Sequence, residues 1–239
     1  MTKMQLLYVH FIVTAVMVHL MGTSSTVLKY NPLIFENETA SNDTSSRIAC
    51  SAAVDIVFLI ESSEHVKGRE NFTQMLWFAS NISHSFLISP DDVLVAGVVF
   101  SDVASKMFDL KDHRDKANVQ SALLNSPYME RDSRTDEALS LVEQGEMFGL
   151  QAGGRYNAAR LVIVIMAGSS SRPDKALASA KSLKDQGVAI ISVGIGDQVG
   201  WELTSMASGP QEIFRADSFH SLDRQKYKLI KRICDGVLD

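Results

Sequence analysis

Glu61, Ser63 and His65 place the three side-chain types of a hydrolytic triad within one short stretch of the chain. A serine nucleophile needs an imidazole within hydrogen-bond distance, an acid that orients the imidazole, and an oxyanion hole nearby. Alternate residues of one tight loop rarely meet that geometry, and the chain has no Gly-x-Ser-x-Gly elbow. We therefore expect no enzymatic activity, and a hydrolase that uses this loop is the remote alternative.

Nucleotide binding is a second chemistry that these residues argue against. The first apolar run leads into Glu61-Ser-Ser-Glu-His, which is neither a Gly-x-Gly-x-x-Gly nor a Walker A loop. The side chains of Glu61 and Glu64 would repel phosphate, and a net charge of −5 argues against nucleic-acid binding. We interpret the basic residues near the C-terminus as a solvated helix face: Arg224, Lys226, Lys228, Lys231 and Arg232.

The segments around this loop alternate between two hydrophobic patterns. Val54 to Ile60 is a near-continuous β-branched and aromatic run, which is typical of a strand covered on both faces. The same reasoning predicts strands at 93–100, 104–110, 161–167, 188–195 and 213–216. The 104–110 strand is expected to form a hairpin with the 93–100 strand. Helical spacing and caps predict helices near 72–86, 116–124, 135–147, 173–186 and 221–234. This alternation predicts an α/β domain with a doubly wound, mostly parallel sheet and helices on both faces.

The N-terminus has the pattern of a secretory signal peptide. Lys3 precedes an apolar run from Leu6 to Met21, and small residues follow it. The run is shorter than the roughly 20 residues that span a bilayer, so we expect cleavage rather than membrane anchoring. We divide the chain into a signal peptide (1–22), a polar spacer (23–49), one domain (50–235) and a short tail (236–239).

Sequons and cysteines fit the same compartment. Four Asn-x-Ser/Thr tripeptides begin at Asn37, Asn42, Asn71 and Asn81, and we expect glycosylation there. The two cysteines, Cys50 and Cys234, bracket the patterned sequence. In an oxidising compartment we expect one disulfide between them.

Six segments follow one another along the chain: DIVFLIESSEHV, VAGVVFSD, DEAL, LVIVIMAGSSS, GVAIISVGIGD and IFRADSFHSL. In this order and spacing they resemble a von Willebrand factor A domain of the matrilin and collagen type. The resemblance covers roughly Cys50 to Asp235. It implies a Rossmann-like sheet with one antiparallel edge strand and a ligand-binding face at the C-terminal ends of the strands.

In that family the binding face carries a metal-ion-dependent adhesion site. An Asp-x-Ser-x-Ser loop, a Thr from a second loop and an Asp after the fourth strand hold Mg²⁺ or a similar ion. The resemblance places Glu61 at the first Asp, Ser63 at the first Ser and His65 at the second Ser. Ser133 corresponds to the Thr, and Ala167 corresponds to the last Asp.

These departures favour loss of the metal site. Ala167 offers no side-chain donor, and the longer side chain of Glu61 displaces the carboxylate. The imidazole of His65 suits Zn²⁺ or Cu²⁺ better than Mg²⁺. The alternative is a weak or variant site for Mg²⁺ or another divalent cation, built from Glu61, Ser63 and Ser133.

A further hypothesis concerns Glu61 and His65 as a pair. A protonated imidazole could stand where the cation would be, and the pair would present a pH-sensitive polar patch to a partner. The test compares partner binding at about pH 5.5 and 7.5 in the wild type and in His65→Ala. Binding that does not change between these pH values would contradict the hypothesis.

The residues and the resemblance together predict a secreted A-type domain that binds other extracellular proteins without a metal ion. The expected partner is a matrix or collagen-like protein and not a nucleic acid. Membrane contact is expected only if the N-terminal segment stays uncleaved. The alternative is a metal-dependent adhesion domain with a variant coordination shell. The predicted face is lined by Glu61, Ser63, His65, Ser133, Ala167 and Ser169.

Overall fold

The computed structural model describes residues 53–236. The chain separates into two units, Met1–Thr44 and Ser45–Asp239, and every described residue belongs to the second. Cys50, the sequons at Asn37 and Asn42, and the signal and spacer segments lie outside the described residues. In the described part of the chain, no helix is long and apolar enough to cross a membrane.

A six-stranded sheet forms the centre of the domain, in the order β3-β2-β1-β4-β5-β6. Every neighbouring pair is parallel except β2 and β3, which form an antiparallel hairpin at one edge. This arrangement confirms the predicted fold class, including the antiparallel edge strand. The strands are β1 (Val54–Glu61), β2 (Val93–Phe100), β3 (Ala104–Phe108), β4 (Ala159–Met166), β5 (Val188–Ile195) and β6 (Ile213–Ala216).

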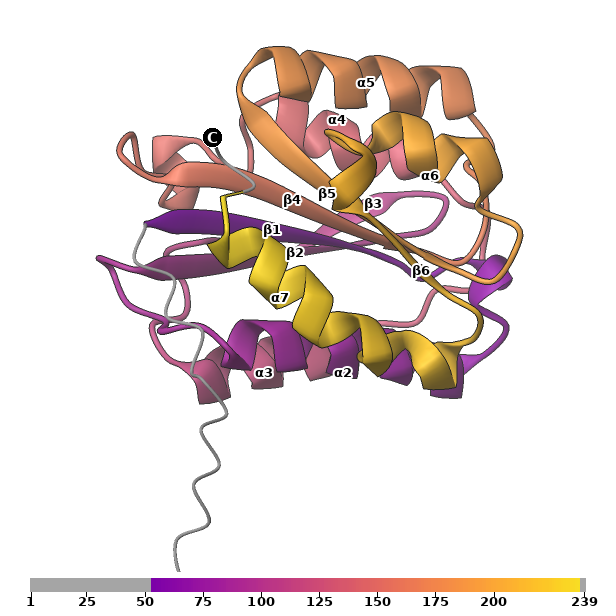
Figure 1. Ribbon diagram of the computed structural model, residues 1–239, viewed down its shortest axis with the longest axis horizontal. Coiled ribbons are helices and arrows are strands. Elements are labelled where there is room, and N and C mark those ends of the chain that lie inside the picture. The colour runs from indigo at the N-terminus through magenta and orange to yellow at the C-terminus, as the bar shows by residue number, and fades with distance from the viewer. Residues whose placement is uncertain (1–52, 237–239) are drawn as a thin grey trace, which may run out of the picture. The chain divides into compact units, whose positions relative to one another are not determined.

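Helices cover both faces of the sheet. In Figure 1, α2, α3 and α7 lie on one face, and α4, α5 and α6 lie on the other. The α-helices are α2 (Arg69–His84), α3 (Lys116–Leu124), α4 (Thr135–Glu143), α5 (Pro173–Asp185), α6 (Gly200–Met206) and α7 (Lys226–Cys234). Four 3-10 turns connect these elements: η1 (Glu64–Val66), η2 (Leu150–Ala152), η3 (Pro210–Glu212) and η4 (Phe219–Gln225).

Each face of the sheet has its own apolar layer. Every residue of β1 and β2 is buried, as their near-continuous apolar runs require. Alternate residues of β1 face opposite layers: Ile56 and Phe58 pack with α2 and α7, whereas Val57 and Leu59 pack with α4 and α5. The predicted apolar stripe is buried in the first layer: Phe72, Leu76, Ala79 and Ile82 on α2, and Phe86 just after the helix ends.

The start of β1 is fixed by a buried ion pair. Asp55 is fully buried, and its carboxylate accepts hydrogen bonds from the backbone N–H and Nε of Arg155 at 2.9 and 2.8 Å. The same guanidinium also donates to the carbonyl of Asp92 before β2. One arginine therefore ties the N-terminal ends of β1 and β2 together.

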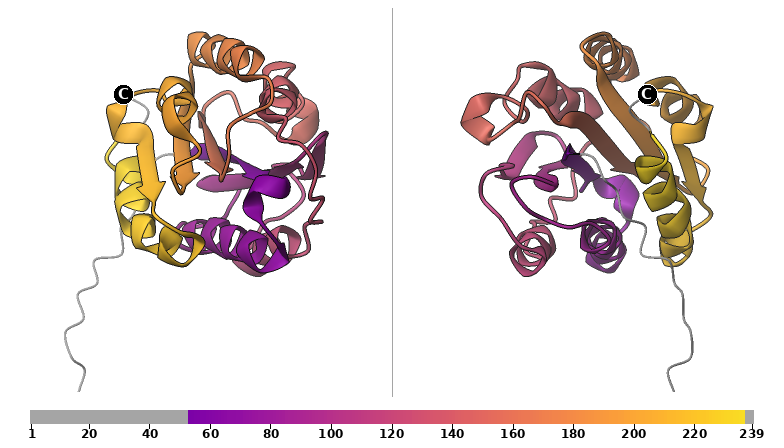
Figure 2. Two further views of the ribbon diagram at one scale, coloured as in Figure 1. Left: turned by 90° about the vertical axis from the view of Figure 1, so that its right-hand side faces the viewer. Right: turned by 60° about the vertical axis from the view of Figure 1, so that its left-hand side comes forward.

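The order in which the strands are added to the sheet reverses at β1. The chain leaves β1 for β2 on one side, and β4 pairs on the other side, so the loops after β1 and β4 diverge. In open α/β sheets, ligands bind outside the carboxyl ends of the strands at this switch point. Figure 2 (left) faces this edge, with the indigo segment that follows β1 turned toward the viewer.

Two tryptophans lie at the surface of the domain. Trp77 on α2 is 43% exposed, and Trp201 on α6 is 58% exposed. Trp77 lies off the buried stripe of α2, and Trp201 lies in the first turn of a short helix whose inward residues are Leu203 and Met206.

Candidate functional site

Glu61 is the last residue of β1, and its carboxylate is fully buried. Oε1 accepts hydrogen bonds from Ser63 Oγ at 2.6 Å and His65 Nδ1 at 3.3 Å. Oε2 accepts hydrogen bonds from the backbone N–H groups of Ala167 at 2.6 Å and Gly168 at 3.2 Å. Each carboxylate oxygen therefore accepts from two donors of the protein itself. Those of Oε1 come from the loop after β1, and those of Oε2 come from the loop after β4.

His65 is held in place by a 3-10 turn, η1, that Ser63 caps. The Ser63 hydroxyl accepts the His65 backbone N–H at 3.1 Å, and the turn ends at Lys67 in the left-handed conformation. The imidazole packs directly on Gly168, where an added Cβ would lie 2.2 Å from the ring. The ring thus fills the space between the loop after β1 and the loop after β4.

Ser133 is also brought to this group of loops. It is fully buried ahead of α4, and its carbonyl accepts the Ser171 backbone N–H at 2.8 Å from the loop after β4. A backbone bridge joins its neighbour Arg131 to Ser63. Among the described residues, the Ser133 hydroxyl has no hydrogen-bond partner. Backbone contacts, and not this hydroxyl, therefore position the loop.

Ser169 is the most exposed of the predicted face residues. Its hydroxyl donates to the carbonyl of Gln198 at 2.7 Å and so joins the loop after β4 to the loop after β5. Beside it, a pocket of about 460 Å³ lies between the loop after β1 and the ends of β5 and β6. Ala167 and Ile195 line the pocket along with His65.

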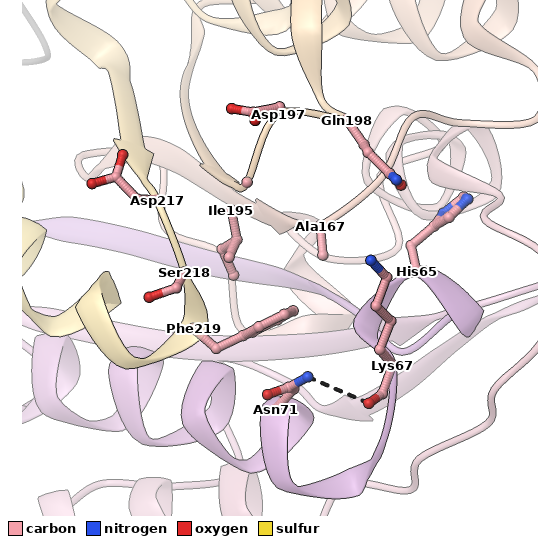
Figure 3. Close-up of a pocket in the computed structure, with 11 residues that line it drawn as sticks. His65, Lys67, Asn71, Ala167, Ile195, Asp197, Gln198, Asp217, Ser218 and Phe219 are labelled. Atoms are coloured by element: carbon pink, nitrogen blue, oxygen red, sulfur yellow. Dashed lines mark hydrogen bonds between the residues drawn. The ribbon is translucent and has the colours of Figure 1, made fainter.

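The pocket contains residues that the sequence reasoning missed. Figure 3 shows Lys67 and Asn71 on the side near His65, and Asp217 on the opposite side. Asp217 directly follows β6, and Asp197 follows β5 after one glycine. That position at the carboxyl edge of the sheet was the available signal for both aspartates.

A second buried carboxylate lies behind the site. Glu202 accepts the Ser170 backbone N–H at 2.8 Å, and burial raises the pKa of Glu202, with the charges of Glu61 and Asp136 adding to the effect. Asp136 itself pairs with Arg134 at 2.7 Å. Glu202 consequently stays protonated to a higher pH than an exposed glutamate, which limits the negative charge near Glu61.

The geometry is not that of a hydrolytic triad. The Ser63 hydroxyl is fully buried and donates directly to the acid. The His65 imidazole bonds the same carboxylate, and only the His65 backbone N–H reaches the serine oxygen. The imidazole is therefore not aligned as the base for Ser63, as a serine triad requires.

The residues at the adhesion-site positions do not fit a hard divalent cation. Mg²⁺ needs near-octahedral oxygen donors with free lone pairs. Both oxygens of Glu61 are occupied by protein donors, and Ala167 contributes only a backbone N–H aimed at that carboxylate. Within residues 53–236, no three His, Cys, Asp or Glu side chains form a metal-binding group.

The pKa of His65 is raised above its ordinary value of 6.5, chiefly by its hydrogen bond to Glu61. The negative charges of Glu61, Glu64 and Asp132 add to the effect, and burial opposes it. Because the folded pKa exceeds the unfolded one, the stabilisation is complete below the unfolded pKa. It is lost as the pH rises through the folded pKa.

We therefore expect the free energy of unfolding of the wild type to be lower at about pH 8.5 than at about pH 6. The part of this difference that comes from His65 should be absent in His65→Gln. Urea denaturation at both pH values measures this. The exposed His220 provides the matched control, and His220→Gln should keep the wild-type pH dependence. Equal pH dependence in the two variants would contradict the Glu61–His65 bond.

Comparison with known proteins agrees with this architecture. The family model of the von Willebrand factor type A domain matches residues 55–227. Matrilin-1 of Gallus gallus is 31% identical over 216 residues, covering 88% of this chain and 43% of matrilin-1. The human collagen alpha-6(VI) chain is 31% identical over 180 residues, covering 75% of this chain and 8% of the collagen chain.

Solved structures extend the comparison. Proximal thread matrix protein 1 from the mussel byssus, solved with a zinc-occupied adhesion motif, has a TM-score of 0.70 at 26% identity, covering 78% of this chain and 47% of the mussel protein. The manganese-loaded TRAP protein of Plasmodium vivax shares the fold, with a TM-score of 0.61 at 20% identity, covering 76% of this chain and 75% of that protein. The chain spans less than half the length of matrilin-1, the collagen chain or the mussel protein. It belongs to the von Willebrand factor type A domain family, and its A domain is of the matrilin and collagen type.

Proposed function

We propose that this chain is a secreted A-type domain that binds extracellular matrix proteins through its loop face without a metal ion. The face comprises Glu61, Ser63, His65, Ser133, Ala167 and Ser169. The observation that carries the proposal is the Glu61 carboxylate, whose two oxygens are both engaged by the chain's own donors. A carboxylate in that state has no free lone pair to hold a bridging cation.

Direct contact with the partner replaces the bridging ion in this proposal. The exposed Ser169 and the partly exposed imidazole of His65 offer polar groups at the surface. The neighbouring pocket of about 460 Å³ offers a concave contact, and concave sites with a few polar groups are typical of binding sites.

The proposed compartment and organisation rest on the sequence. Signal peptide 1–22, spacer 23–49, domain 50–235 and tail 236–239 are proposed, with a disulfide between Cys50 and Cys234 and glycans at the four sequons. The names of the similar proteins, matrilin-1 and a collagen VI chain, support an extracellular setting and a matrix partner.

Solid-phase binding of the secreted chain to immobilised collagen VI and matrilin-1 tests the proposal, with albumin as the negative surface. We expect saturable binding to at least one matrix protein that is equal in Mg²⁺ and in EDTA. Ser169→Arg should weaken it about tenfold or more, because a bulky charge is added at the most exposed residue of the face. Ala178→Arg adds the same charge on an exposed position of α5 and should leave binding unchanged. Binding equal in both variants, or absent altogether, would contradict the proposal.

A variant metal site is the second candidate, and one observation favours it. The mussel relative holds zinc at its adhesion motif, and His65 supplies an imidazole, a ligand that suits zinc. Zinc would have to displace the Ser63 and His65 hydrogen bonds to Glu61. Matrix binding that EDTA abolishes and that Zn²⁺ restores would establish this candidate over the metal-independent one.

A further inference from the structure

One sequon opens directly onto the pocket beside the loop face. Asn71 lies in the first turn of α2 and lines the pocket together with His65 and Lys67 (Figure 3). The next residue, Phe72, is fully buried and stacks on Tyr128 with ring centroids 5.5 Å apart. This packing fixes the turn, so the half-buried side chain of Asn71 is held at the edge of the pocket.

Both hydrogens of the Asn71 amide are used within the chain. Nδ2 donates to the carbonyl of Val66 at 2.9 Å in a partly buried contact. It also donates to the carbonyl of Lys67 at 3.3 Å in an exposed contact, drawn as a dashed line in Figure 3. The second bond is the longer and more accessible one, so its hydrogen is the one that can be replaced without opening the buried contact.

We propose that Asn71 carries an N-linked glycan that covers the pocket, so that occupancy of this sequon controls access to that part of the loop face. The inference rests on the proposed secretion of the chain. Transfer from a lipid-linked oligosaccharide forms a bond between Nδ2 and the anomeric carbon, the amide loses one proton, and the lipid pyrophosphate leaves. The remaining N–H keeps its hydrogen bond to the Val66 carbonyl, and the sugar takes the place of the hydrogen that pointed to the Lys67 carbonyl.

The other described sequon provides an internal contrast. Asn81 lies on the same helix, but its amide donates to Asp223 of η4 at 3.3 Å, and it does not line the pocket. A glycan is bulky and solvated wherever it is attached. Of the two sequons among the described residues, the one at Asn71 therefore stands between solvent and the pocket and the one at Asn81 does not, which makes Asn81 a matched control.

Glycopeptide mass spectrometry of the secreted full-length chain, combined with acylation of lysines by an N-hydroxysuccinimide ester, tests the inference. Thr73→Ala removes the sequon without changing Asn71, and costs only the exposed bond from Thr73 to the Arg69 carbonyl. We expect Asn71 to be occupied, and Lys67 to react about fivefold faster in Thr73→Ala, because the bulky glycan is gone. The rate at the exposed Lys175 on α5 serves as the reference.

The control variants separate access from other effects. Thr73→Ser retains the sequon, and Asn81→Gln removes the other one, so both should keep the slow Lys67 reaction. Two results would overturn the inference but leave the proposed function standing. One is a glycan on Asn81 with none on Asn71. The other is an equal rate of Lys67 acylation with and without the Asn71 glycan. A chain that stays in the cell with no glycan at any sequon would contradict both.

Discussion

Replacing Glu61 by alanine is expected to lower the free energy of unfolding by about 3 kcal/mol. The change leaves two buried backbone N–H groups, those of Ala167 and Gly168, without acceptors, and it leaves the charged form of His65 without its partner. The imidazole is partly exposed, so the cost falls at the lower end of the range for breaking a buried pair. Urea or thermal denaturation of the wild type and the variant measures it.

Glu64→Ala is the matched control for that experiment. Glu64 lies in the same loop but its side chain is exposed and belongs to none of the ion pairs found among the described residues. A change of less than about 0.5 kcal/mol is expected there. If Glu61→Ala is as mild as Glu64→Ala, the carboxylate is not held by the chain's own donors. It would then be free for a cation.

The second large effect is expected from Gly168→Ala. The added Cβ would lie 2.2 Å from Cγ and Nδ1 of His65, so the ring must shift, and we expect this to break its 3.3 Å hydrogen bond to Glu61. We expect a loss of about 1–3 kcal/mol, which is typical of overpacking, and a fall in the His65 pKa toward its ordinary value as the Glu61 bond is lost. Denaturation and a histidine NMR titration measure the two effects.

A double variant distinguishes this clash from a general loss of stability. His65→Gly removes both the ring and the Cβ of His65, which would lie 2.6 Å from the added Cβ, so Gly168→Ala should then cost little more. The two changes are therefore expected to be strongly non-additive. Gly200→Ala is the matched glycine control, because nothing lies within 4 Å of its added Cβ. Additive effects of His65→Gly and Gly168→Ala would contradict direct packing of His65 on Gly168.

The strands were predictable because a strand buried on both faces consists of a near-continuous run of apolar residues. The 93–100 strand and the 116–124 helix have the predicted bounds. The bounds of α6 were not predicted, since seven residues beginning at Gly200 are too few to show a clear apolar stripe. α4 ends at Glu143 and not at Met147, because Gly145 turns the chain with a φ of 80°.

The candidate site was predictable in its residue types but not in its contacts. The family resemblance pointed to Glu61, Ser63 and His65, and their spacing in one loop agrees with the bonds that join them. The bonds from Ala167 and Gly168 to Glu61 cross more than 100 residues of sequence, and no local pattern encodes them. Only the packing of β4 beside β1 brings these groups together.

Calorimetric titration of the secreted domain with Mg²⁺, Mn²⁺ and Zn²⁺ tests the central claim most directly. A variant that restores the family pattern, Glu61→Asp with His65→Ser, Ser133→Thr and Ala167→Asp, is the positive control, and it should bind a divalent ion at or below about millimolar. We predict no saturable heat for the wild-type domain under the same conditions. Saturable binding by the wild type that Glu61→Ala abolishes would contradict the account.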